Sequence, residues 1–320
     1  MRNCFNTVPH FYIPIKYLLL YDNNNFNNNI TDMAKFLKKF STHSEYEAYI
    51  ASEGKVLPNV SICDDTKDVH YNPFVETRVV AKFNVTSTSS PTQLCFNDAV
   101  RQFSAIEIDD VVQPSVVSAY TFSTTGEHTV KYTLTDPTSI GGNVFQNCSS
   151  LTSIEIPNNV TSIGDYAFSY CSGLTSIEIP DSVTTIGNGV FRYCYSLSSI
   201  YMSSGVTSID SMTFQHCSGL TSINIPSGVT SIGSYAFNGC KNLTSIDIPD
   251  SVTSIGENAF NGCYGTTIIT VRASTPPTLS NSNAFNSTGL CPICVPSGSV
   301  DAYKAASGWS GYADRIQAIP

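Results

Sequence analysis

Apolar positions recur every 23 residues through the second half of the chain. Five full copies of one pattern open at Leu151, Leu174, Leu197, Leu220 and Leu243. In the first copy the constant apolar positions are Leu151, Ile154, Ile156, Val160, Ile163, Ala167, Phe168 and Cys171. A degenerate copy with Ile140, Gly141, Phe145 and Cys148 in register precedes them, and a worn copy spans 266–289. A fixed period of this length predicts a solenoid, in which each coil covers the apolar face of the next.

The order of residue types within one copy predicts its local structure. Ile154 and Ile156 alternate with polar residues, which is the period of a half-buried strand. Pro157 ends this strand because proline has no N–H for the ladder. Residues 160–163 then predict a second short strand, followed by a turn at Gly164. Residues 165–168 predict a single helical turn.

The repeated motif LxxIxIPxxVxxIGxxAFxxCxx resembles the BspA-like (Treponema pallidum-type) leucine-rich repeats of bacterial and protist surface proteins. The resemblance covers residues 137–289, and the tail at 290–320 is similar to the C-terminal cap of such proteins in gut Bacteroidales. It implies an arc-shaped solenoid and, commonly, adhesion or protein binding, without a particular ligand. The expected fold is mainly β, a leucine-rich-repeat solenoid of 23-residue coils with a small β-rich N-terminal module and a C-terminal cap.

The first seventy residues do not follow the repeat. Residues 1–32 hold an apolar run of eleven residues, too short to span a membrane, and then an asparagine-rich stretch. We interpret this segment as a disordered leader or a mis-annotated start, with Met33 as the true first residue. Residues 33–70 predict a small unit with a helix from Ser44 to about Ser52 and strands at 57–63 and 68–74. This unit also resembles the leading segment of some Bacteroidales phage and prophage proteins.

Residues 71–136 predict a β module. Strand-like runs occupy 78–86, 104–108, 116–122 and 128–134. Their hairpin-like pattern fits a small immunoglobulin-like or PKD-like sandwich, or an N-terminal cap for the solenoid. At the other end, Ser299 is expected to cap a helix at 300–306, and Trp309 and Tyr312 to pack on the last coil.

Six of the eleven cysteines form one column, at one position per copy: Cys148, Cys171, Cys194, Cys217, Cys240 and Cys263. A count alone suggests disulfides or metal ligands. Because the residue recurs beside the phenylalanine of each copy, we interpret it as a small buried apolar residue with a weak S–H donor. Cys291 and Cys294 form a lone CxxC without a second pair or suitably spaced histidines, so we expect packing in the cap rather than redox or zinc chemistry.

Charge and motifs argue against several functions. The net charge is −9, and the full copies carry eight acids against Arg192 and Lys241, so we expect no nucleic-acid partner. The five histidines are scattered, and no nucleophile elbow, phosphate loop or HExxH motif occurs. We therefore predict a protein that is not an enzyme and needs no cofactor or metal. Calcium at Asp165, Asp181 or Asp250 is a weaker alternative, since no ligand-rich loop supports it.

The positions that vary between copies are the candidates for recognition. On the strand face they are Glu155, Glu178, Tyr201, Asn224 and Asp247, beside a ladder of serines and threonines. In the column before the cysteines they are Tyr170, Tyr193 and His216, then two glycines. Tyrosine among small polar residues makes a good recognition surface. The alternative is that these tyrosines only cover the coil edges.

We therefore predict a repeat scaffold that presents a ligand-binding or adhesive surface to a protein or glycan on a cell surface. Its expected location is extracellular or at the cell surface, and we expect no membrane span. The alternative is a phage virion or prophage accessory protein that reads a host surface.

Overall fold

The computed structural model describes residues 60–62, 69–71 and 78–320, in two compact units divided between Glu76 and Thr77. In the first unit, β1 (Val60–Ile62) and β2 (Val69–Tyr71) form an antiparallel pair within the two runs expected to be strands. The predicted leader, the start at Met33 and the helix at 44–52 lie outside the described residues.

The second unit begins with an antiparallel sheet. Its strand order is β10-β3-β8-β5-β6, where β10 is the first strand of the repeats. The bounds are β3 (Arg78–Val85), β5 (Phe103–Ile108), β6 (Val111–Val112) and β8 (Gly126–Leu134), with the short 3-10 helix η2 (Asn97–Gln102) before β5. A separate pair joins β4 (Thr92–Gln93) to β7 (Ala119–Tyr120). Because β3 pairs along β10, this module closes the N-terminal end of the solenoid.

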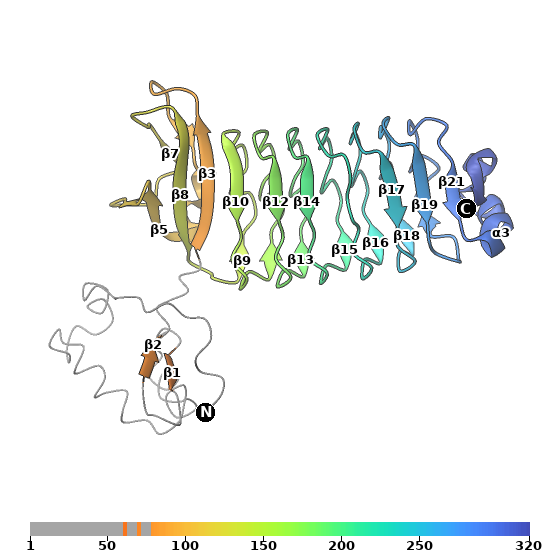
Figure 1. Cartoon of the computed structure of the whole chain (residues 1–320), viewed down its shortest axis with the longest axis horizontal. Helices are drawn as coiled ribbons and strands as arrows, with labels where there is room; N and C mark the ends of the chain where they lie inside the picture. The colour runs from red at the N-terminus through yellow and green to blue at the C-terminus, as the bar shows by residue number, and fades with distance from the viewer. Residues whose placement is uncertain (1–59, 63–68, 72–77) are drawn as a thin grey trace. The chain divides into compact units, whose positions relative to one another are not determined.

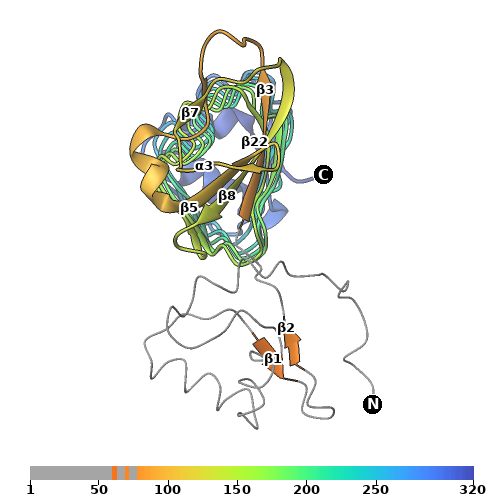
Figure 2. The ribbon, with the colours of Figure 1, turned by 90° about the vertical axis from the view of Figure 1, so that its left-hand side faces the viewer.

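The repeats stack as coils with short parallel strands, side by side from β10 to β21 (Figure 1). The strands near the start of each copy are β10 (Leu151–Glu155), β12 (Ser176–Glu178), β14 (Ser199–Tyr201), β17 (Ser245–Ile248) and β19 (Ile268–Val271). The second series is β9 (Ser139–Ile140), β11 (Ser162–Ile163), β13 (Thr185–Ile186), β15 (Ser208–Ile209), β16 (Ser231–Ile232), β18 (Ser254–Ile255) and β20 (Thr278–Leu279). Viewed along the stack, the coils overlie one another in register (Figure 2). The mainly β solenoid expected from the repeat is confirmed.

The constant positions of the repeat form the core. Phenylalanines of successive coils stack face to face, with centroids 5.1–5.6 Å apart and interplanar angles of 14° or less. The column comprises Phe145, Phe168, Phe191, Phe214, Phe237, Phe260 and Phe285, all fully buried. At its first end Phe103 and Tyr132 pack against Phe145, so the N-terminal module covers the column there.

The cysteine column is buried beside these rings, as the repeat predicted. From Cys171 to Cys263, each thiol donates to the carbonyl oxygen of the phenylalanine in the preceding coil, at 3.0–3.3 Å. Burial raises the pKa of the thiols, to about 12 for Cys194 and Cys263. All six are free thiols, so they act as small buried side chains that join one coil to the next.

The helical turn predicted at 165–168 is wrong. Tyr166 within this segment and Tyr170 just after it have left-handed backbones, at φ 56° and φ 61°. The N–H groups of Tyr166, Phe168 and Tyr170 donate to carbonyls of the next coil at 2.8–2.9 Å. Hydrogen bonds between coils thus replace the i→i−4 bonds of a helix, and the segment is a row of turns.

The C-terminal segment covers the other end of the stack. It contains β21 (Ile293–Val295), the 3-10 helices η3 (Ser297–Ser299) and η4 (Ser310–Arg315), α3 (Val300–Ala305) and β22 (Ile316–Ala318). Trp309 and Tyr312 pack against Phe285, with centroids 5.4 and 5.7 Å away, which confirms their predicted place. Ser299 does precede α3, but its hydroxyl donates to Ser274 O at 2.6 Å instead of capping the helix.

Candidate functional site

The five strand-face candidates lie on five consecutive coils, and all are exposed. Glu178 and Tyr201 are direct partners in the parallel pair β12–β14. Asp247 in β17 makes a bidentate ion pair with Arg272, at 2.7 and 2.6 Å. Asn224 belongs to the fourth full copy, where residues 221–226 form no strand. The column is therefore continuous in sequence, although its backbone pairing is interrupted.

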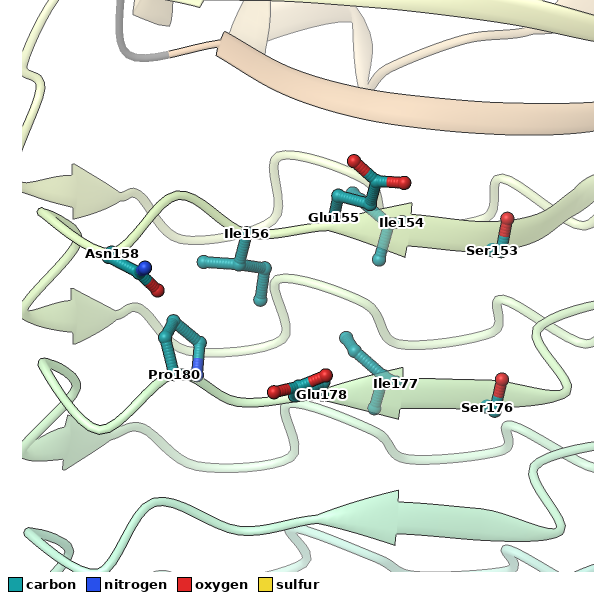
Figure 3. Close-up of a pocket in the computed structure, with 9 residues that line it drawn as sticks. All are labelled: Ser153, Ile154, Glu155, Ile156, Asn158, Ser176, Ile177, Glu178 and Pro180. Atoms are coloured by element: carbon teal, nitrogen blue, oxygen red, sulfur yellow. The ribbon is translucent and has the colours of Figure 1, made fainter. Parts of the chain in front are cut away.

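A hollow lies at the N-terminal end of this column, between the first two full coils (Figure 3). Glu155 and Glu178 contribute one carboxylate each from neighbouring strands. Ser153 and Ser176 border it at one end, Asn158 and Pro180 at the other. Because β10 pairs with β3 and β12 pairs with β14, no strand ladder joins the two sides of the hollow. The structure thus brings Glu155 and Glu178 to one open, acidic depression.

The serine and threonine ladder beside the column is structural. The hydroxyls of Thr175, Ser198 and Thr244 donate to the carbonyl oxygen of the same position in the preceding coil, at 3.1–3.4 Å. These hydroxyls therefore connect coils and are not free to select a ligand.

The second candidate column, Tyr170, Tyr193 and His216, is a stack of rings. The centroid distances are 4.5 Å for the tyrosine pair and 5.0 Å between Tyr193 and His216. All three residues have φ near 61°, and the glycines that continue the column, Gly239 and Gly262, also have positive φ. A Cβ on Gly239 would lie 2.4 Å from His216 Nδ1, so the histidine ring covers this glycine. Each ring thus packs against the residue at the same repeat position of the next coil.

The rings of this column therefore pack on one another across neighbouring coils. Tyr193 is sandwiched between two rings, whereas Tyr170 keeps 41% of its surface exposed. Burial, followed by the charges of Arg192 and Lys241, lowers the pKa of His216 from its ordinary value. A recognition role for these residues stays a prediction.

Several neighbours of this stack were not among the sequence candidates. The Arg192 guanidinium lies 4.7 Å from the Tyr193 centroid and donates to the Tyr193 hydroxyl at 3.3 Å. Tyr195, 48% exposed, contacts Tyr193 at 5.8 Å between centroids. A signal was present in the sequence, because residues 16–23 of all five copies contain both cations of the copies and no acid.

Two of the three acids weighed as calcium ligands, Asp165 and Asp181, accept hydrogen bonds from the adjacent coil. Asp165 accepts from the backbone N–H of Asn188 at 2.7 Å. Asp181 accepts from the backbone N–H of Ser204 at 3.2 Å. These carboxylates tie coils together, and no group of three His, Cys, Asp or Glu in the described part of the chain could hold a metal ion.

The remaining titratable groups also hold the fold. In the N-terminal module His128 Nδ1 lies 2.6 Å from Asp109 Oδ2, and His128 Nε2 lies 3.0 Å from the Thr124 carbonyl oxygen. Both ring nitrogens are therefore engaged within the protein. Cys291 and Cys294 are buried near the C-terminus, where Arg315 donates to the Cys291 sulfur at 3.4 Å. No helix within the described segments is long and apolar enough to cross a membrane.

The repeats match the model of the BspA type leucine rich repeat region, in six copies, over residues 138–268 and 207–305. The two matches together span just over half of the chain. The chain belongs to the BspA-type leucine-rich repeat family.

Solved structures of other bacterial leucine-rich repeat proteins are similar to this chain. A leucine rich cell surface protein from Faecalibacterium prausnitzii is 40% identical, covering 42% of this chain and 35% of its own, with a TM-score of 0.36. A leucine-rich repeat protein from Bacteroides ovatus is 31% identical over 55% of this chain and 45% of its own, with a TM-score of 0.43. The leucine rich repeat protein of T. pallidum is 22% identical over 50% and 75%, with a TM-score of 0.42. This BspA-type chain thus covers less than half of the first two proteins, and no curated protein matches it.

Proposed function

We propose that this BspA-type chain is a non-enzymatic scaffold that binds a protein or glycan at a cell surface. One observation carries the proposal: the constant apolar positions of the repeat are buried, apart from the partly buried Ile200 and Ile223, whereas the strand-face column is exposed and changes from glutamate to tyrosine, asparagine and aspartate along the stack. A column that packing does not restrict is free to be selected for recognition. The family match and the description of the F. prausnitzii relative as a cell surface protein support the location.

The strand face also suits reversible binding. Tyr201 is 54% exposed and offers a large amphipathic ring on β14, directly beside Glu178. A tyrosine has only two side-chain torsions to restrict, so it gives contact area at a low cost in entropy. The nearby hollow at Glu155 adds a concave border to this face.

The test is binding of the purified full chain to a panel of immobilised extracellular proteins and glycans. For a ligand that binds, Tyr201→Ala and Glu178→Ala should each weaken binding several-fold and leave the melting temperature within a few degrees, because both side chains are exposed. Leu290→Ala, which truncates a side chain 94% exposed outside the repeats, is the matched control and should change neither. Unchanged binding in both strand-face variants would reject this face as the site.

The location is tested separately. Protease treatment of intact producing cells, followed by mass spectrometry of the released peptides, should yield peptides from the repeats. Recovery only from phage particles would replace the cell-surface location with the virion alternative.

A further inference from the structure

A second surface on the repeats has its own charge pattern, and we call it the aromatic–cationic corner. It consists of side chains from positions 19–22 of four successive copies: Tyr170, Arg192, Tyr193, Tyr195, His216 and Lys241.

The structure brings these residues together. Tyr193 contacts Tyr170, Tyr195 and His216 through its ring. Arg192 lies against the same ring. Burial lowers the pKa of His216 most, and the charges of Arg192 and Lys241 lower it further. The only two cations of the five full copies therefore both act on His216, on a chain of net charge −9.

Arg192 is held in place but incompletely paired. Its Nη2 donates to the Tyr193 hydroxyl, and its Nε is buried without a hydrogen-bond partner. The ion pairs among residues 78–320 include neither Arg192 nor Lys241. Because Nε is buried, a ligand would meet the two terminal nitrogens of Arg192, whose fork matches the two oxygens of a carboxylate, and the fixed position of the guanidinium reduces the entropy lost on binding.

We propose that the aromatic–cationic corner binds a carboxylate-bearing glycan, with Arg192 receiving the carboxylate and Tyr195 packing on a sugar ring. This inference rests on the proposed function, since it names a ligand class for the same scaffold. Tyr195 is tilted 53° from Tyr193, so its ring is not stacked as Tyr193 is between Tyr170 and His216, and an amphipathic ring suits the C–H face of a sugar. Two cations can bind one or two carboxylates of such a glycan at a time.

A peptide fits this corner less well. The N–H groups of Tyr170, Tyr193 and His216 donate to carbonyls of the next coil at 2.7–2.8 Å, so no strand edge is open for a peptide backbone. The corner also offers no exposed aliphatic residue, whereas serines and asparagines such as Ser172, Ser196 and Asn242 surround it and can bind sugar hydroxyls.

The experiment is calorimetric titration of the full chain with tetragalacturonate and with sialyllactose, each paired with a neutral counterpart, the methyl ester and lactose. At least one acidic probe should bind at least about 10-fold more tightly than its neutral counterpart. Arg192→Gln should remove that preference, Arg192→Lys should restore it in part, and Tyr195→Ala should weaken both members of the pair. Lys304→Gln, which removes an exposed cation of α3 outside both proposed surfaces, is the matched control and should leave the affinity unchanged.

Melting temperatures of all variants establish that they fold. Equal affinity for acidic and neutral probes, or an unchanged preference in Arg192→Gln, would overturn the proposal. So would binding of neither acidic probe, or binding of an oligoglutamate peptide in their place. Such a failure leaves the proposed function standing if the panel ligand still depends on Tyr201 and Glu178, so the two failures are distinguishable.

Discussion

Phe214 lies at the middle of the phenylalanine column, and its removal tests how the stack is held together. Its ring is fully buried between Phe191, 5.6 Å away, and Phe237, 5.2 Å away. Phe214→Ala removes both ring contacts and leaves a cavity. Substitutions of this kind cost about 3–5 kcal/mol, and each aromatic contact accounts for roughly 0.5–1.5 kcal/mol beyond the buried area.

The effect should be local as well as large. Each coil contacts only its neighbours, so a weak coil in the middle divides the stack into two less coupled parts. We expect the melting temperature to fall on the order of 10 °C. Hydrogen exchange should accelerate in the coils around Phe214, while β3 and β8 keep their protection.

The assay is thermal unfolding by circular dichroism with hydrogen exchange read by mass spectrometry. Phe214→Leu is the matched control: it keeps most of the volume and loses mainly the two ring contacts, so it should cost about 1–3 kcal/mol. A loss under about 1 kcal/mol in Phe214→Ala, or an equal loss of protection in β3 and β8, would refute the reasoning.

Three further predictions concern the cysteine column, the turns and the C-terminal cap. Burial raises the pKa of the column thiols from 9.0, to about 12 for Cys194 and Cys263, so the folded state keeps protons that the unfolded chain loses above pH 9. The free energy of unfolding should therefore fall as the pH rises from about 9 to 12, by about 1.4 kcal/mol per thiol at pH 10. Denaturant titrations at pH 7 and 10 measure this fall, and a variant with alanine at the six column cysteines is the control. Equal stability of the unsubstituted protein at the two pH values would contradict the prediction. Gly239→Ala should destabilise the fold more than Gly262→Ala, because a Cβ at Gly239 displaces the His216 ring. Gly262→Ala should cost only about 1 kcal/mol, for alanine in a left-handed backbone conformation. Equal losses in melting temperature, or no reduction of the Gly239→Ala loss in a His216→Ala background, would show that the ring does not cover this glycine. Trp309→Ala should cost about 3–5 kcal/mol and expose β19 and β21 to hydrogen exchange first, since Trp309 packs on Phe285 and its indole N–H donates to Pro277 O at 2.7 Å. Protection lost first in β3 would contradict a cap role.

The repeat made the fold predictable, because a buried column needs the same residue type in every copy. The leucine, phenylalanine and cysteine columns are all in the core, the isoleucine columns are too apart from the partly buried Ile200 and Ile223, and Trp309 covers the end of the core as expected. The row of turns was missed because tyrosine rarely adopts a positive φ. Gly239 and Gly262, in the same column as Tyr170, were the available signal for a left-handed position.

The candidate surfaces were predictable only in part. The varying positions identified which side chains would be exposed, because packing does not restrict them. Partners between coils were not visible: Arg272 lies in the worn copy, 25 residues from Asp247, and the serine and threonine hydroxyls are used by the backbone. The common effect of Arg192 and Lys241 on His216 could not be predicted without the stacking of the coils, since 49 residues separate the two cations in the chain.

The central claim is that exposed, variable side chains of the repeats hold the ligand. Hydroxyl-radical footprinting of the full chain, with and without a ligand from the panel, tests it most directly, because tyrosine side chains report their own accessibility. We predict that Tyr201, or Tyr170 and Tyr195, lose reactivity on binding. Protection confined to Tyr120 of the N-terminal module, with every repeat tyrosine unchanged, would contradict it.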